Sequence, residues 1–423
     1  MRWSGVDTHI EVPCVPANPR LDHPESVATR QELGLPIDRP IIMTGHQPVM
    51  PHPGLLAKFV MAAMLAKKCD GVLAFLVVDT VTEPLGWIDV PVGSPPLGLQ
   101  SHPYEFLAQQ HGLACRRKPA VVNPLQAPDG LDDQYVMGLD LMQASYMNAH
   151  AETAAEQSAQ AMLALLQPWI GQPHMINVSD LLDTPAGQHM ISQMQRDPAS
   201  CASAYQEAIV QWPHAGISSL NQNQLPLWRE DGLNRVQATI QDVRHGNQLL
   251  PQALLTTAIA RSAICDLFVH GIGGWRYDNV MEHWMECWLG ETVSPSACAT
   301  ADLRLPSCEE EHILVALQHA RMIHRRVWHD PDCDGKSAIS SHKQSLLKAI
   351  QAAATKEARH EAFKQLHFWL QSHRPSHLGL REAMQGASCA RRRDWALPFY
   401  PLAQLNQLVN SLSEVEVPPP AIC

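Results

Sequence analysis

The stretch RPIIMTGHQPVMPHPGLLAKFVMAAMLAKKCDGVLAFLVVD, residues 39–79, decides the fold of this chain. Its first part, residues 39–45, is a short apolar strand ending in glycine, and residues 72–78 form a second apolar run of strand length. Between them, residues 55–68 have apolar side chains at helical spacing and end in Lys67-Lys68, where the helix dipole favours cations. Strand, helix and strand form a βαβ unit, so we predict a parallel sheet.

The rest of the chain supplies further elements in the same alternation. We expect a helix that starts at Thr256, a strand at 267–269, a helix that stops at Gly290, a strand at 299–305 and a helical arm near 336–372. The predicted fold is therefore α/β, with a parallel sheet core, helical insertions and a C-terminal helical arm. The expected segments are 1–135 for the first half of the core, opening with a Pro-rich irregular lead-in to about residue 40; 136–250 for a mostly helical connecting region; 251–335 for the second half of the core; and 336–423 for the arm and the C-terminal segment.

The composition indicates a globular chain and disfavours several classes of function. The 423 residues are 45% hydrophobic and 17% charged, which is typical of a folded protein with a large core. A net charge of -11 disfavours a general nucleic-acid binder, because phosphates are neutralised by clustered Lys and Arg, although 22 His residues lower the negative charge in mild acid. The N-terminus lacks an apolar signal segment, and no apolar run is long enough to span a membrane.

The cysteines favour a reducing compartment. There are 11, an odd number, scattered from Cys14 to Cys423 and never spaced Cys-x-x-Cys. A secreted disulfide framework is usually even and denser, so we expect reduced, mostly buried thiols in a cytoplasmic protein. Cys287, Cys298 and Cys308 lie too far apart in sequence for a compact zinc knuckle, and we expect no metal site.

The first candidate site is the turn after the first strand. Thr44-Gly45-His46-Gln47-Pro48 and His52-Pro53-Gly54 lead directly into the start of a helix. Backbone N–H groups at a helix start attract phosphate or carboxylate, and His46 and His52 add donors. Nucleotidyl transferases and class I synthetases have a related His-x-Gly-His loop in this turn, but here Leu55 stands in place of the last His. We interpret the turn as a binding site; the alternative is that both His side chains only cap the helix.

The second candidate is the acidic segment Asp79 to Glu83, which follows the second strand. Ligands of open parallel sheets bind beside the carboxyl ends of the strands. Asp79 and Glu83 are therefore placed to meet a ribose, an amine or a metal. The alternative is a solvated loop with two carboxylates.

The third candidate is His270-Gly271-Ile272-Gly273-Gly274, followed by Trp275-Arg276-Tyr277-Asp278. Glycines allow the backbone to approach a ligand closely. The segment also supplies a base, a cation, a hydroxyl and a carboxylate, which favours a site. Close packing of a helix on a strand also requires glycine, and this is the alternative.

The fourth candidate, Asp330 to Gly335, matches only the first half of a calcium loop. Ser341 stands where the bidentate Glu should be, so we interpret this segment as a polar turn between helices.

These motifs together resemble the bacillithiol synthase (cysteine-adding) family. The Thr44 to Pro48 loop is similar to the family's Thr-Gly-Gln-Gln-x-Gly loop, and His270 to Gly274, followed by Tyr277, lies where the family has Gly-Gly-Pro-Gly-Glu. Further matching pieces are Ala301 to Leu305, for an Arg-x-Ser-Ala-Thr-Leu-like strand, and Phe399 to Leu405, for a closing Phe-Pro-x-x-x-Leu segment. A separate bacterial group related to those synthases shares Gly45-His46-Gln47, His52-Pro53-Gly54, Val77-Val78-Asp79 and His270 to Asp278.

This resemblance implies a Rossmann-like core of the class I synthetase and nucleotidyl transferase kind, with a coiled-coil arm. It implies an enzyme that condenses or transfers a small molecule, an amino-thiol or a nucleotide-linked substrate, with ATP or ADP as the candidate nucleotide. The arm suggests a homodimer. The synthases have Glu-Asp-His-Asp after the second strand where this chain has Asp79 to Glu83, and His46 replaces the first Gln of their loop.

Two hypotheses follow for the function. In the first, an enzyme binds a small molecule beside the sheet, with His46 and His52 contacting phosphate or developing negative charge and Asp79 orienting an amine or a ribose. His270 acts as general base, and Arg276 or Arg304 holds a carboxylate. The second hypothesis is a non-catalytic ligand-binding or scaffold protein that kept the fold. The candidate ligand-binding residues are Gly45, Gln47, His52, Gly54, Gly271, Gly273, Gly274, Arg276, Tyr277, Asp278 and Arg304.

Overall fold

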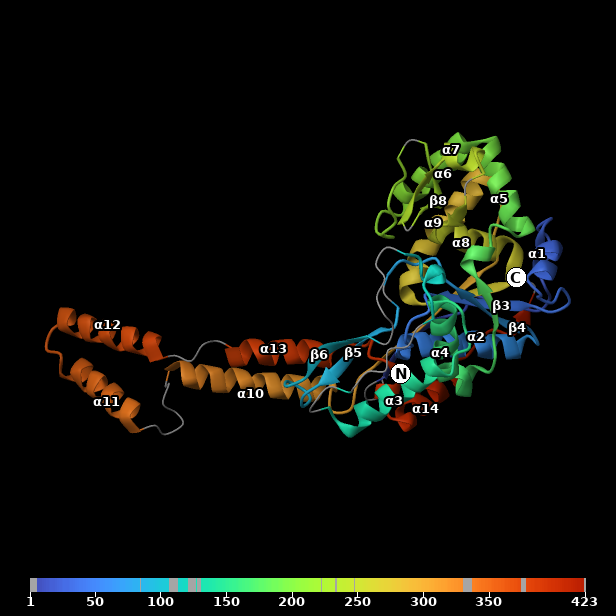
Figure 1. The fold of residues 1–423 in the computed structure, drawn as a ribbon. Coiled ribbons are helices and arrows are strands. Elements are labelled where there is room, and N and C mark those ends of the chain that lie inside the picture. Colours follow the sequence, from blue (N-terminus) through green and yellow to red (C-terminus); the bar gives the residue numbers. More distant parts are fainter. Residues whose placement is uncertain are drawn as a thin grey trace. The chain divides into compact units, whose positions relative to one another are not determined.

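The computed structural model describes residues 6–83, 85–105, 113–120, 127, 131–221, 223–232, 234–246, 248–329, 337–373 and 378–421 (Figure 1). The chain forms two compact units, which are described separately. The first unit contains Met1–Val90, Pro103–Leu303 and Arg393–Cys423, and the second contains Pro91–His102 and Arg304–Arg392.

A six-stranded sheet forms the centre of the first unit, in the order β1-β12-β11-β3-β4-β7. All neighbours in it are parallel except β1 and β12. The five parallel strands can be numbered 1 to 5 in chain order, from β3 to β12. Counted across the sheet from β7, they lie in the order 3-2-1-4-5, which is the doubly wound order of Rossmann-like folds. The predicted α/β fold with a Rossmann-like core is thus confirmed. The bounds are β3 Ile41–His46, β4 Val72–Val77, β7 His174–Asn177, β11 Leu267–His270 and β12 Ser296–Leu303.

The lead-in is more regular than the sequence analysis predicts. Strand β1 (Val6–Glu11) pairs antiparallel with β12 along the edge of the sheet, and helix α1 (Ser26–Glu32) follows. Sequence VDTHIE has too few apolar residues to identify a strand by itself, because an edge strand buries only part of one face. Short strand β2 (Val15–Pro16) pairs with β13 (Pro420–Ala421), so the segment after β1 lies beside the C-terminal end of the described chain.

The expected helix at Thr256 begins earlier. Helix α8 spans Ala253–Ile259, directly after strand β10 (Leu249–Pro251), and continues as a π turn at Ala260–Ile264. Helix α9 (Ile272–Leu289) ends as predicted at Gly290, which has the positive φ of 67° that glycine adopts easily.

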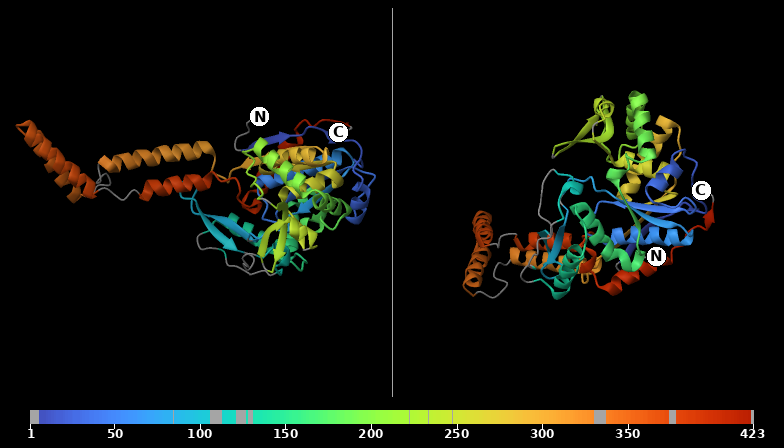
Figure 2. Two further views of the ribbon diagram at one scale, coloured as in Figure 1. Left: turned by 90° about the horizontal axis from the view of Figure 1, so that it is seen from above. Right: turned by 45° about the vertical axis from the view of Figure 1, so that its right-hand side comes forward.

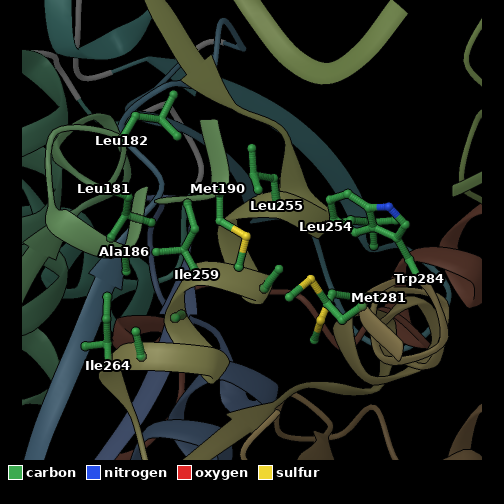
Figure 3. Close-up of a cluster of buried hydrophobic side chains, with 14 of the residues drawn as sticks. Leu181, Leu182, Ala186, Met190, Leu254, Leu255, Ile259, Ile264, Met281 and Trp284 are labelled. Atoms are coloured by element: carbon green, nitrogen blue, oxygen red, sulfur yellow. The ribbon is translucent and has the colours of Figure 1, made fainter. Parts of the chain in front are cut away.

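One face of the sheet carries the largest hydrophobic core. Ile41, Met43 and Ile176 point from the strands into a cluster formed with helices α5 (Pro185–Arg196), α6 (Pro198–Gln211), α8 and α9. Figure 3 shows part of this cluster, where Met190 and Ile259 face Leu255 and Trp284 lies near Leu254. This face fixes α9, and therefore the segment after β11, against the sheet.

Helix α2 (Pro53–Lys68) covers the opposite face and is buried on almost every side. It packs on β3, β4, β11 and β12, and α4 (Ala154–Ile170) and α14 (Leu402–Ser413) contact it as well. Phe59 of α2 meets Phe75 of β4 edge to face at 5.0 Å between ring centroids. A helix covered in this way has room for few polar side chains.

The remaining elements of the first unit extend this core (Figure 2). Helix α3 (Asp133–Met147) packs on α4, and a three-stranded antiparallel sheet has the order β10-β8-β9. The other bounds are β8 Gln224–Asp231, β9 Asn234–Thr239, α7 Ile240–Arg244 and the 3₁₀ turns Cys115–Arg117, Val178–Asp180 and Leu397–Phe399. Strands β5 (Trp87–Val92) and β6 (Gln100–Glu105) pair with each other, and each continues from one unit into the other.

The second unit is mainly helical. Helix α10 (Glu310–His329) packs against α13 (Leu378–Ala390), and α11 (Ser337–Ala352) packs against α12 (Lys356–His373). Ile350, Leu366, Trp369 and Leu370 form the small core of the second pair. None of the described helices is both long enough and apolar enough to cross a membrane.

The cysteines largely follow the expectation. Among the described residues, eight cysteines are free thiols, and six of these are buried. Cys14 departs from it, because it is disulfide-bonded.

Candidate active site

The two loops singled out from the sequence lie side by side. Strands β3 and β11 are parallel neighbours, with Val269 opposite Thr44, so Gly45 and His270 leave the same edge of the sheet next to each other. Thr44 Oγ1 donates a hydrogen bond to the Val269 carbonyl at 2.8 Å and ties the two strand ends together. We call this edge, where the parallel strands end, the carboxyl edge. The chain reverses its direction across the sheet between β3 and β11, which is where ligands bind in doubly wound folds.

Lys58 of α2 joins these loops, and it is a residue that the sequence analysis missed. Its side chain is 3% exposed, and Nζ donates a hydrogen bond to the Gly45 carbonyl at 2.7 Å. Its Cδ lies 3.9 Å from the place where a Cβ on Gly271 would stand. Burial lowers the pKa of Lys58 to about 7. The signal in the sequence was a single lysine inside the apolar run of residues 55–66.

His46 is a neutral, half-buried imidazole at the end of β3. Burial, with the nearby charge of Lys58, lowers the pKa of His46 to about 3. Its Nδ1 lies 2.9 Å from the Gln47 carbonyl and must be the donor, because a carbonyl only accepts. The neutral ring therefore has its lone pair on Nε2, which can accept a proton or a hydrogen bond from a ligand.

His52 caps helix α2, which is the alternative role that the sequence allows. It is the N-cap residue of α2, and its Nδ1 accepts a hydrogen bond from the Gly54 N–H at 3.2 Å. Burial lowers the pKa of His52 to about 4, which keeps this acceptor unprotonated. A Cβ on Gly54 would lie 3.0 Å from the His52 ring and 3.1 Å from Thr300 Oγ1, so this glycine serves the cap.

His270 is held by a buried chain of charges. Its Nε2 lies 2.9 Å from Asp278 Oδ2, and the same carboxylate oxygen accepts from Nη1 of Arg261. Arg261 is fixed in turn by the Ser294 carbonyl, 2.7 Å from its Nε. Burial alone would raise the pKa of Asp278, but His270 and Arg261 outweigh it and hold that pKa below its usual value. An ionised Asp278 places the His270 proton on Nε2 and leaves the lone pair on Nδ1.

The start of α9 lies directly against that lone pair. Gly271 is the N-cap residue and has no side chain to cap the helix, so the first N–H groups of α9 have no acceptor from the cap. A Cβ on Gly274 would lie 2.8 Å from His270 Nδ1, whereas one on Gly273 would meet nothing within 4 Å. Glycine is therefore required at 274, because any side chain there would cover the basic nitrogen of His270.

Both carboxylate oxygens of Asp79 accept hydrogen bonds from a neighbouring loop. Oδ1 accepts from the Ser179 N–H at 3.0 Å and Oδ2 from the Ser179 hydroxyl at 2.5 Å. Burial raises the pKa of Asp79 even though Ser179 and Arg116 lower it. In this arrangement the carboxylate joins the segments that follow β4 and β7.

The other predicted ligand-binding residues are distributed unevenly. Tyr277 lies beside His270, with 6.4 Å between the ring centroids, and burial with the Asp278 charge raises the pKa of Tyr277 to about 12. Gln47 and Arg276 are exposed. Arg304 belongs to the second unit. The half-match to a calcium loop, Asp330 to Gly335, lies outside the described residues.

Among the residues that the structure describes, two groups of side chains have ligand atoms close enough to share a metal ion, and both lie in the first unit. In His23, His189 and Glu291, the Nδ1 atom of His23 accepts from the Glu25 N–H at 3.1 Å, so the ring proton is on Nε2, the atom 4.0 Å from Glu291. That proton leaves His23 without a lone pair to offer. In Glu207, His283 and Cys287, slight desolvation and the charges of Glu207 and Glu286 raise the pKa of the exposed Cys287 thiol, so a cation would first have to displace its proton.

The carboxyl edge of β3 and β11 therefore combines three chemical functions. It has a buried lysine in Lys58, backbone N–H groups at the start of α9 that no described side chain caps, and an oriented imidazole in His270. The first two attract an anionic group, and the third can remove a proton beside it.

The chain matches no protein-family model, and no curated protein matches it in sequence. Among solved structures, one similar chain is tyrosyl-tRNA synthetase complexed with L-tyrosine, from Archaeoglobus fulgidus, with 10% sequence identity and a TM-score of 0.29. The match covers 93% of this chain and 96% of that one. The fold class given above rests on the strand order and not on this likeness.

Proposed function

We propose that this chain is an enzyme that condenses or transfers an anionic small molecule at the carboxyl edge of β3 and β11, a ligase or transferase of the bacillithiol-synthase-like type. The observation that carries the proposal is the environment of Lys58. This side chain is buried between the two loops, and its bonding partner is the neutral Gly45 carbonyl. A phosphate or carboxylate at the start of α9 would supply the missing counter-charge.

In this proposal His270 is the general base. Asp278 fixes the ring and its tautomer, so that Nδ1 can take the proton from an attacking amine or thiol. Lys58 and the α9 N–H groups hold the anionic group of the substrate and stabilise negative charge as it develops. The resemblance found in the sequence supports an amino-thiol or a nucleotide-linked compound as substrate, with ATP or ADP as the nucleotide.

The test is a thermal-shift panel of ATP, ADP, cysteine and sugar conjugates, followed by turnover assays with each compound that binds. We expect Lys58→Met to lose the ligand-induced rise in Tm, and the exposed Lys67→Met on the same helix to keep it. His270→Gln should bind ligand but lose turnover by about 10²- to 10⁴-fold, while the exposed His245→Gln stays active. A folded wild-type chain that responds to no compound in the panel would contradict the proposal.

A second candidate is a ligand-binding protein without catalysis. It is favoured by the two residues expected to do chemistry that instead have structural partners, Asp79 with Ser179 and His52 with the Gly54 N–H. Ligand binding by the wild type that depends on Lys58, with no turnover of any bound compound, would select this candidate.

A further inference from the structure

Three side chains that can bind a metal ion lie together where α6 packs on α9. Glu207 of α6 and His283 and Cys287 of α9 each offer one ligand atom, and these atoms lie within 4.8 Å of one another. His283 and Cys287 are four residues apart, so one turn of α9 places both on the same face. Oxygen, nitrogen and sulfur ligands of these kinds are those that zinc uses in proteins. Sequence spacing does not show the group, because Glu207 comes from a different helix.

Packing between the two helices fixes the backbone on which these ligands stand. Trp284, which follows His283 directly, is fully buried, and its ring meets that of Tyr205 edge to face at 5.6 Å between centroids. Its Nε1 donates a hydrogen bond to the Cys201 carbonyl at 3.3 Å. Because both helices are held to each other beside the ligand positions, only side-chain rotamers remain to be ordered when an ion binds.

The separation of the two ligands on α9 suits a tetrahedral ion. Cys287 Sγ lies 3.6 Å from His283 Nε2. A tetrahedral zinc ion with a Zn–S bond of about 2.3 Å and a Zn–N bond of about 2.0–2.1 Å sets its sulfur and nitrogen ligands about 3.6 Å apart. A hydrogen bond from the thiol to the imidazole has a similar length, so the third ligand, Glu207, is what points to a metal.

The ligand atoms have no other use within the described part of the chain. There Glu207 forms no ion pair or hydrogen bond, and Cys287 is the one polar partner of His283. Glu207 and Cys287 are exposed and His283 is half-buried, so an ion can enter from solvent. Glu286 adds a second carboxylate beside the Cys287 thiol, and no described Lys or Arg forms an ion pair with either Glu. The local charge therefore favours a divalent cation.

We propose that Glu207, His283 and Cys287 form a zinc site that joins α6 to α9, with the fourth position of the tetrahedron open to water. As the ion binds, a zinc–sulfur bond forms and the thiol proton passes to the solvent, without any change of oxidation state. His283 lies about 18 Å along α9 from Gly271, as twelve residues of helix require, so the zinc site is separate from the Lys58 site. It does not depend on the proposed function.

The test uses the full chain, treated with a chelator, kept reduced, and titrated with Zn²⁺ in competition with a chromophoric chelator and separately with Co²⁺. We expect a single tight site, with the visible spectrum of tetrahedral Co²⁺ and a thiolate-to-cobalt absorption band. Cys287→Ser should lose the band. Cys287→Ser, His283→Gln and Glu207→Gln should each weaken zinc binding by at least about tenfold, because even the loss of a residue that only orients a ligand costs about 10- to 100-fold.

Two variants serve as matched controls. Cys389→Ser removes the other free thiol of the described residues that is not buried, and His245→Gln removes an exposed imidazole. Both should bind zinc like the wild type. Zinc should also raise the Tm of the wild type and of both controls but not that of Cys287→Ser, since an ion that binds only the folded chain stabilises it.

Proton release gives an independent readout. Calorimetric titration in two buffers of different ionisation enthalpy should show release of the thiol proton by the wild type and less release by Cys287→Ser. Equal zinc affinity in the wild type and all three ligand variants would place the ion elsewhere, for example at His23, His189 and Glu291, and would overturn the proposal. A cobalt complex without a thiolate band, or a wild type that binds neither ion, would overturn it as well. Each result leaves the anion-binding tests of Lys58 unaffected.

Discussion

In the first unit, one buried basic side chain lies where the parallel strands begin and another lies where they end. The two differ in whether an opposite charge lies beside them. At the edge where the strands begin, Arg30 is fully buried and its Nη2 lies 2.9 Å from Asp266 Oδ1. Asp266 also accepts from the Ile41 N–H at 2.6 Å, so the pair locks the starts of β3 and β11 together. At the carboxyl edge, Lys58 has the Gly45 carbonyl as its hydrogen-bond partner, the Phe59 ring lies 5.6 Å from its Nζ, and no carboxylate of the described residues forms an ion pair with it.

Whether a buried basic side chain has an opposite charge beside it distinguishes a structural residue from a functional one more clearly than its degree of burial does. In a buried ion pair whose members are also bonded to backbone, each charge has an opposite charge within the fold, and no ligand is required, although Nε and Nη1 of Arg30 have no hydrogen-bond partner among the described residues. A buried lysine bonded to one neutral carbonyl is not compensated, which is why its pKa falls to about 7. Perturbed groups of the second kind tend to occur at functional sites.

Breaking the compensated pair should give the largest effect. Arg30→Met leaves Asp266 buried without its cation, so we expect the free energy of unfolding to fall by about 3–5 kcal/mol in urea titrations at pH 7. Burial already raises the pKa of Asp266, and loss of Arg30 should raise it further. A group whose pKa is raised by folding lowers stability as pH increases, so the defect should be smaller at pH 4 than at pH 7. The exposed Arg39→Met is the control; an equal loss in both variants would contradict this account.

Removing the uncompensated cation should have the opposite sign. Lys58→Met should raise the free energy of unfolding by about 2–4 kcal/mol at pH 6, after the loss of about 1 kcal/mol for its hydrogen bond. The pKa of Lys58 is lowered from 10.5 to about 7 by folding, so between those pH values the unfolded chain binds more protons. Wild-type stability should therefore rise with pH in that window, and the gain from the variant should shrink.

Lys67→Met is again the matched control, since it removes an exposed lysine from the same helix. A Lys58→Met chain that is less stable than the wild type at pH 6 would mean that the lysine is compensated after all. The comparison between the two edges would then fail.

The sequence was sufficient for the fold and only partly sufficient for the site. The pattern of residues 39–79 identifies the βαβ unit because fully buried parallel strands are continuous apolar runs. It also placed the His46 and His270 loops beside one sheet edge, since both follow strands. The polar strand Val6–Glu11 escaped detection, because its pairing with β12 is decided by tertiary contacts.

Individual roles depended on atoms that no motif specifies. The sequence motif gives His46 and His52 the same expected role, because both lie in the turn between β3 and α2. In the structure, His52 caps α2 through Nδ1, whereas His46 directs its Nδ1 to the Gln47 carbonyl. Asp79 lies where a ligand-binding carboxylate is expected. Both of its oxygens, however, accept hydrogen bonds from Ser179, which is distant in sequence. In the sequence, Lys58 is only a single charge within an apolar helix. The burial of its side chain could not be predicted, because it depends on α2 being covered on almost every side.

Two adjacent glycines sharpen the comparison at the carboxyl edge. A Cβ on Gly274 would lie 2.8 Å from His270 Nδ1, while one on Gly273 would be in open space. We expect Gly274→Ala to lower the free energy of unfolding by about 1–3 kcal/mol through overpacking and to abolish any turnover. Gly273→Ala should be neutral or slightly stabilising, because alanine is the better helix former. Equal behaviour of the two variants, by urea titration and activity, would show that Nδ1 does not need this opening.

The smallest expected effect concerns His52, a half-buried group at the carboxyl edge that stays neutral and therefore needs no counter-charge. His52→Ala removes the cap of α2 and should cost about 1 kcal/mol at pH 7, whereas His52→Asn should keep the cap and cost less. Folding lowers the pKa of His52 to about 4, below its ordinary value of 6.5, so the unfolded chain binds more protons between those pH values. Stability contributed by the neutral ring is therefore lost as pH falls through this window. His52→Asn should therefore make the Tm of thermal unfolding less sensitive to pH between 6.5 and 4. A pH dependence equal to that of the wild type would show that the neutral His52 ring does not contribute to the stability of the carboxyl edge.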